Sequence, residues 1–201
     1  MYRLPKFGRT ITAGHAAQIS NMNPPLKTAD KIQYGFKRIS TANLLQQDDH
    51  LAYPSRLRGE KWLQACLNPQ LEPNVPEEIA FLYEVARGSM VYGLFFLPLA
   101  SLATEQCFRV LEAGARHRCK QLGLLKKQRG KEKVLPDTPF AALVAALQKA
   151  GKISTGDLRS WETLPFLRNL FSHPKSQTIR SRKEAARQLA YTAELLNRLF
   201  N

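Results

Sequence analysis

The sequence contains few cysteines, few acidic residues and no apolar run long enough to cross a membrane. The cysteines, Cys66, Cys107 and Cys119, are odd in number and lack CxxC spacing, which argues against a disulfide framework. We therefore expect them to be small buried residues of a reduced, cytoplasmic protein. The most apolar run, residues 91–103, contains Pro98 and is shorter than the roughly 20 residues of a transmembrane helix, so no membrane partner is expected.

Acidic residues are outnumbered by basic ones, 16 to 30, in a chain of 201 residues. The formal net charge of +14 and the isoelectric point near 10 predict a polyanionic partner, nucleic acid before an anionic membrane surface. Hydrophobic residues still make up 44% of the chain, which is enough to fill a core. The chain is therefore expected to be globular rather than disordered.

Basic residues are concentrated between Arg116 and Lys133, where Glu132 is the single acid. A run of this kind is typical of a segment that binds nucleic acid, but it is as common in loops that are only solvated. We keep both interpretations. In the first, the contacts would come from Lys126, Lys127, Arg129, Lys131 and Lys133.

Helical patterns dominate the chain after residue 76. Residues 1–76 are rich in Gly, Pro, Asn and Thr, and we expect them to form a mostly irregular N-terminal arm with one short helix around Trp62. Pro76, followed by two glutamates, is typical of a helix start. We therefore predict a helical domain over residues 77–201.

Residues 79–122 are compatible with helix almost throughout. They predict either two helices or one kinked helix, with breaks at Gly88, Gly93 and Pro98. Gly123 is expected to end this part of the domain.

The remaining sequence predicts further helices. One begins at Pro139, a second begins at Asp157 and is interrupted or kinked at Pro165, and a third covers residues 182–200 with an apolar face at helical spacing. No alternating strand pattern competes with them. The fold class is therefore predicted to be all-α, a helical bundle.

A candidate phosphate-chemistry motif lies before the last helix, in the segment from Arg168 and Asn169 to His173. Arginine offers a planar charged fork to phosphate oxygens, and histidine exchanges protons near neutral pH. Neither residue needs a metal, so no cofactor is expected. Pro174 should end this helix at about His173. The alternative interpretation is structural: His173 caps helix carbonyls and Arg168 pairs with an acid.

Glu105 and Arg109 lie four positions apart within an apolar stretch. Such a pair is usually a surface ion pair. The apolar neighbours suggest partial burial, in which case Glu105 would need a charged partner such as Arg168 or His173.

The order of helices, the Arg168-Asn169-x-x-x-His173 segment and the Glu105-x-x-x-Arg109 segment resemble the HEPN domains. The resemblance covers about residues 77–200. HEPN domains are small all-α bundles that occur in toxin–antitoxin and phage-defence systems and in eukaryotic RNases. The resemblance implies a HEPN-like helical domain after the irregular arm.

The resemblance also implies a dimer in which two motifs face a shared cleft and cleave RNA without metal. His173 would transfer protons at the ribose 2′-hydroxyl and the leaving oxygen, Arg168 would hold the scissile phosphate, and Asn169 would orient the pair. Glu105 and Arg109 would have a supporting role. RNA is expected to contact the basic run and also Lys175, Arg180, Arg182 and Lys183.

Two functional hypotheses remain open at the level of sequence. The first is a metal-independent endoribonuclease that acts as a toxin or defence effector, as a homodimer and with an antitoxin as a further partner. The second is a non-catalytic helical module that binds RNA or a protein. The second is favoured by the lack of a Gly-rich phosphate loop, a carboxylate cluster or a nucleophile elbow.

Overall fold

The computed structural model describes residues 41–48, 57–124, 138–172 and 181–201. The regular structure within these ranges is entirely α-helical, which confirms the predicted all-α class. No helix among the described residues is long and apolar enough to cross a membrane. The helices are α2 (Gly59–Leu67), α3 (Glu77–Tyr92), α4 (Pro98–Gln121), α5 (Phe140–Lys149), α6 (Thr155–Ser172) and α7 (Arg182–Phe200).

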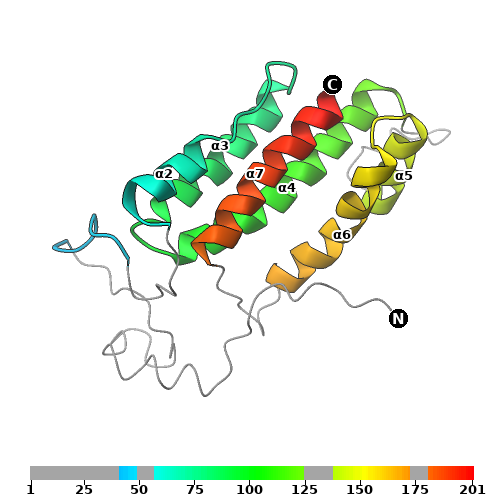
Figure 1. Cartoon of the computed structure of the whole chain (residues 1–201). Helices are drawn as coiled ribbons and strands as arrows, with labels where there is room; N and C mark the ends of the chain where they lie inside the picture. Colours follow the sequence, from blue (N-terminus) through cyan, green and yellow to red (C-terminus); the bar gives the residue numbers. More distant parts are fainter. Residues whose placement is uncertain (1–40, 49–56, 125–137, 173–180) are drawn as a thin grey trace.

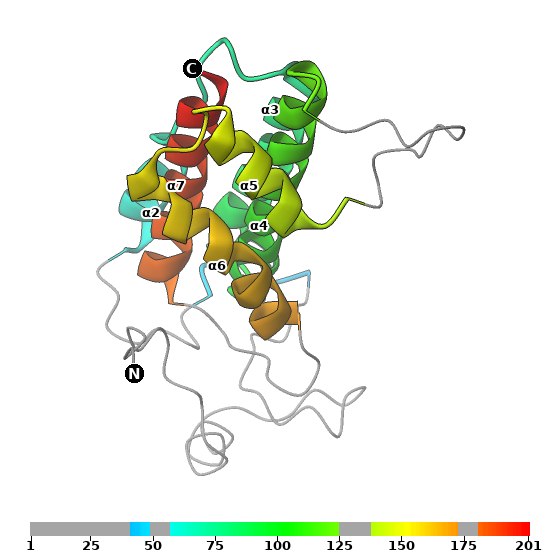
Figure 2. The ribbon, with the colours of Figure 1, turned by 90° about the vertical axis from the view of Figure 1, so that its right-hand side faces the viewer.

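The helices form three side-by-side groups (Figures 1 and 2). The central pair is α4 and α7, with α2 and α3 on one side and α5 and α6 on the other. Gly114 lets the central pair approach closely, because a Cβ atom added there would lie 2.7 Å from Cδ2 of Leu196. A single cluster of buried apolar side chains runs through all the helices.

Glycine and proline end some of the expected helices but not others. Gly93 follows α3 and Pro98 opens α4, so residues 79–122 form two helices, as one of the two alternatives predicted. Gly123 has a φ of +64°, which suits a helix stop. Gly88 was expected to break the helix but lies within α3, and α6 continues through Pro165.

The short helix predicted in the N-terminal part is α2, and it packs into the same core as the later helices. Trp62 is fully buried, and its indole N–H donates to the carbonyl of Val91 at 3.3 Å. Cys66, Cys107 and Cys119 are all fully buried, as predicted, and no disulfide joins them. Burial raises the pKa of Cys66 to about 12, and the pKa of Cys119 is raised to about 11 for the same reason.

The start of α7 is fixed by a capping box and by a buried arginine. Ser181 and Glu184 exchange side-chain and backbone hydrogen bonds across the first turn. Arg182 is only 2% exposed, and its Nη2 donates to the carbonyls of Asp48 and Leu94. The buried carboxylate of Asp48 accepts the backbone N–H of Leu97 at 3.0 Å. This anchor ties the segment before α2 and the α3–α4 connection to the last helix.

Candidate functional site

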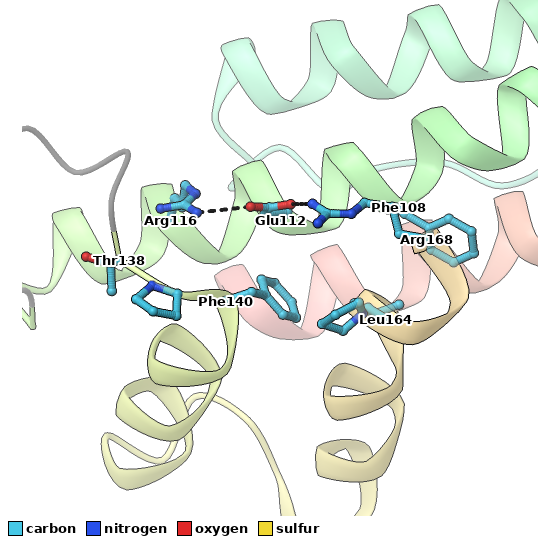
Figure 3. Close-up of a pocket in the computed structure, with 9 residues that line it drawn as sticks. Phe108, Glu112, Arg116, Thr138, Phe140, Leu164 and Arg168 are labelled. Atoms are coloured by element: carbon cyan, nitrogen blue, oxygen red, sulfur yellow. Dashed lines mark hydrogen bonds and ion pairs between the residues drawn. The ribbon is translucent and has the colours of Figure 1, made fainter. Parts of the chain in front are cut away.

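Arg168 lies near the end of α6 and points toward α4 (Figure 3). Its Nη1 donates to Oε2 of Glu112 at 2.6 Å, across 56 positions of sequence. The Arg168 side chain is 42% exposed, so it is accessible to a ligand. The motif arginine is therefore held by a carboxylate and still faces solvent.

Glu112 holds a second arginine with its other oxygen. Arg116, one turn later on α4, donates from Nη2 to Oε1 of Glu112 at 3.0 Å. The carboxylate thus lies between two guanidinium groups, as Figure 3 shows. We call these residues the Arg168–Glu112–Arg116 triad; with two cations and one anion, it keeps a net positive charge.

A cavity of about 250 Å³ opens beside the triad. Its other walls come from α4, the start of α5 and the middle of α6 (Figure 3). Most of these walls are apolar, and Thr138 adds a hydroxyl. The residues that complete the lining are Phe108, Thr138, Pro139, Phe140, Leu164 and Pro165. A cationic edge next to aromatic walls can accept a phosphate and the flat face of a base.

The second motif residue, Asn169, is exposed at the end of α6. The described part of α6 reaches Ser172, so the helix stop predicted at about His173 lies outside the described residues. His173 follows directly and lies outside the described residues. The predicted RNA contacts that lie outside them as well are Lys126, Lys127, Arg129, Lys131, Lys133, Lys175 and Arg180.

Among the described residues, Glu105 is not the partner of Arg168 that the sequence suggested. Glu105 is partly buried, and burial raises its pKa, while the neighbouring charge of Arg109 lowers it. Arg109 is exposed, and within the described part of the chain the two side chains form no ion pair. The carboxylate that Arg168 contacts is Glu112, seven positions further along α4.

The prediction that Arg182 contacts RNA needs correction. Its guanidinium is buried and donates to the carbonyls of Asp48, before α2, and Leu94, in the α3–α4 connection. It is therefore not available to RNA. Lys183, the next residue, is exposed and remains available for such a contact.

Sequence reasoning missed Glu112 as a site residue. A signal for it was present, since Glu112 and Arg116 are four apart and share a helix face with Glu105. Its pairing with Arg168 depends on how α6 packs on α4, and a local sequence pattern does not predict that packing.

No group of three or more His, Cys, Asp or Glu side chains within the described ranges is placed to hold a metal ion. A comparison of the chain with protein-family models, with curated proteins and with solved structures finds no match.

Proposed function

We propose that this protein is a metal-independent endoribonuclease that cleaves RNA by attack of the ribose 2′-hydroxyl. The observation that carries the proposal is the position of Arg168: half-exposed, fixed by Glu112 and next to a cavity with a net positive edge. This is the arrangement that a phosphate-holding group requires. His173, five positions after Arg168, would supply the proton transfer.

The ion pair with Glu112 orients Arg168 without disabling it. Ion pairs between partly exposed side chains contribute roughly 0–1 kcal/mol, so an RNA phosphate can compete for the guanidinium. The carboxylate contacts one terminal nitrogen of a group that has five N–H donors. In the proposed mechanism, Arg168 keeps its direction through Glu112 and offers further donors to the phosphate as negative charge grows on it.

The chemistry assigned to the motif explains why the substrate would be RNA. A base removes the proton of the 2′-hydroxyl, the oxygen attacks the adjacent phosphorus, and the leaving 5′-oxygen takes up a proton. The products are a 2′,3′-cyclic phosphate and a 5′-hydroxyl. DNA lacks the nucleophile. Because one histidine supplies one proton-transfer group, we further propose a homodimer that brings two motifs to one cleft.

Substitution of Arg168 tests this proposal directly. Purified protein is expected to cleave single-stranded RNA in excess EDTA, and Arg168→Ala is expected to lower the rate by about 10²-fold or more because a charge-stabilising donor is lost. Arg159→Ala is the matched control, since Arg159 is an exposed arginine on the same helix. Cleavage that requires a divalent metal, or equal losses in the two variants, would contradict the mechanism.

The second candidate function is a non-catalytic module that binds RNA or a protein partner. One observation favours it: the motif arginine already has a carboxylate partner, as in a purely structural ion pair. This hypothesis predicts that the Arg168→Ala variant binds RNA almost as well as the unaltered protein and that neither protein produces a 2′,3′-cyclic phosphate.

The basic segment after α4 can be tested under both hypotheses. Replacing Lys126, Lys127, Arg129 and Lys131 with glutamine is expected to weaken RNA binding and to flatten its dependence on salt. Each lost phosphate contact on a single strand should change the slope of log K against log salt by about 0.7. Binding measured by fluorescence anisotropy at several salt concentrations gives the slope. An unchanged slope assigns the segment to a solvated surface.

A further inference from the structure

The outer face of α3 carries large apolar side chains that the bundle does not bury. The opposite face of the helix supplies Ile79, Tyr83, Ala86 and Met90 to the core. On the outer face, Phe81 is 67% exposed, Val85 45% and Tyr92 61%. Together with Gly88 these residues recur at helical spacing and line one side of α3. We call Phe81, Val85, Gly88 and Tyr92 the α3 stripe.

Gly88 is unexplained by the packing of the described residues. Among them, a Cβ atom added there would meet nothing within 4 Å, and its φ is not in the left-handed region. Glycine is less favourable inside a helix than any residue except proline. Its usual advantage in such a place is to let another backbone or side chain approach closely, and the described part of the chain supplies no such neighbour.

The charge of α3 points to protein rather than to nucleic acid. The helix contains Glu77, Glu78 and Glu84 against the single base Arg87, in a chain with a net charge of +14. RNA would be repelled by this surface. Two copies of the chain that meet through α3, by contrast, would avoid most of the repulsion between their basic surfaces.

We infer that the α3 stripe docks a second copy of this chain in an antiparallel, two-fold symmetric pair. With the axis between residues 86 and 87, Phe81 lies opposite the partner's Tyr92, and Val85 lies opposite the partner's Gly88. Each aromatic ring then meets an aromatic ring, and each valine enters the gap that a glycine leaves. The stripe is complementary to itself, which an isologous interface requires.

The area of the stripe suits a reversible dimer. If a fully exposed ring has about 200 Å², the three large side chains offer about 300 Å² of apolar surface per copy. Interfaces are about 60% apolar, so the pair would bury about 1,000 Å² in total. That is near the lower limit for a specific interface. A dissociation constant in the micromolar range is therefore expected.

This surface is separate from the candidate site. The α3 and α6 helices lie on opposite sides of the central α4–α7 pair (Figures 1 and 2). An α3 pair would leave the α6 face of both copies open, and it does not depend on the proposed nuclease activity. If the motif face also pairs as proposed above, the two contacts together would build assemblies larger than a dimer, and loss of the α3 contact would reduce them to the motif-face pair.

Gly88→Leu tests the inference with the full chain. The new side chain meets open space in the single chain and favours helix, so the thermal unfolding midpoint should be kept or raised. In the dimer the same side chain would occupy the space of the partner's Val85. Sedimentation velocity over a concentration series should show a dissociation constant at least about tenfold higher than that of the unaltered protein.

Gln148→Leu is the control, because it adds leucine to an exposed position of α5 and should leave the dissociation constant unchanged. The inference is overturned if the unaltered protein stays monomeric at about 100 μM. It is also overturned if Gly88→Leu dimerises as well as the unaltered protein does.

A cross-linking experiment separates a second copy from other occupants. Because Cys66, Cys107 and Cys119 are buried, Val85→Cys introduces one accessible thiol. A short bismaleimide should join two copies of this variant, and it should not join two copies of Gln148→Cys. A Val85→Cys thiol that is shielded from maleimide in a monomer would show that another part of the same chain covers the stripe, and the inference would be wrong.

Discussion

Replacement of His173 by alanine is expected to reduce RNA cleavage by about 10²- to 10⁴-fold, the usual loss for one general acid–base group. In the proposed mechanism this histidine moves the proton at the 2′-hydroxyl or at the leaving oxygen, and water replaces it poorly. Rates are measured on a saturating single-stranded RNA in excess EDTA. Product ends are identified by their sensitivity to phosphatase before and after acid treatment, which opens the cyclic phosphate.

His117→Ala is the matched control for this experiment. His117 lies on α4 and contacts Glu78 of α3. The α3 helix lies on the opposite side of the α4–α7 pair from α6 (Figure 1). Its loss should leave the rate within about twofold, a small change in activation free energy. If His173→Ala cleaves at the rate of the unaltered protein while circular dichroism shows both to be folded, the catalytic assignment fails. The non-catalytic binding module is the better hypothesis if neither protein cleaves RNA.

Of the substitutions that we propose, replacement of Arg182 is expected to cause the largest decrease in the free energy of unfolding. Arg182→Leu leaves the carbonyl of Asp48 without its guanidinium donor in a buried place, whereas the carbonyl of Leu94 still accepts the backbone N–H of Asp48 at 2.9 Å. An unsatisfied buried group costs about 1–3 kcal/mol, so a decrease of about 2 kcal/mol in the free energy of unfolding is expected. Urea denaturation followed by circular dichroism measures it.

Lys183→Leu provides the comparison, because Lys183 is the exposed neighbour of Arg182. Surface substitutions usually change stability by less than about 0.5 kcal/mol. Equal effects at the two positions would show that the anchor of Arg182 contributes little.

The helices that the sequence predicted well are those with a regular apolar face and clear end signals. For α7, the predicted and observed bounds are the same, because the apolar spacing is continuous and a capping box precedes it. The prediction of a helix break was wrong at Gly88. Glycine lowers helix stability locally, but tertiary packing on either side of it keeps α3 continuous. At Pro165, of the two predicted alternatives, α6 continues through the proline instead of starting again at Phe166.

Only part of the candidate site could be predicted from the sequence. The Arg168 and Asn169 segment was singled out because its residue types can carry phosphate chemistry, and the described structure places both residues near the end of α6. Glu112 was not found, since its partner lies on another helix. Arg182 was misassigned for a related reason: a basic residue beside other basic residues appears exposed until the packing of distant segments is known.

The buried anchor at Arg182 also has a consequence for the order in which the protein can fold. Its hydrogen bond to Asp48 spans 134 positions, so the loop it closes includes every helix from α2 to α6. During synthesis, the apolar surface of α4 stays without its α7 partner until that helix has left the ribosome, and the arginine at the start of α7 is the first residue to arrive. A nascent chain that stops short of Arg182 leaves the apolar centre of the bundle exposed, and such surface is prone to aggregation.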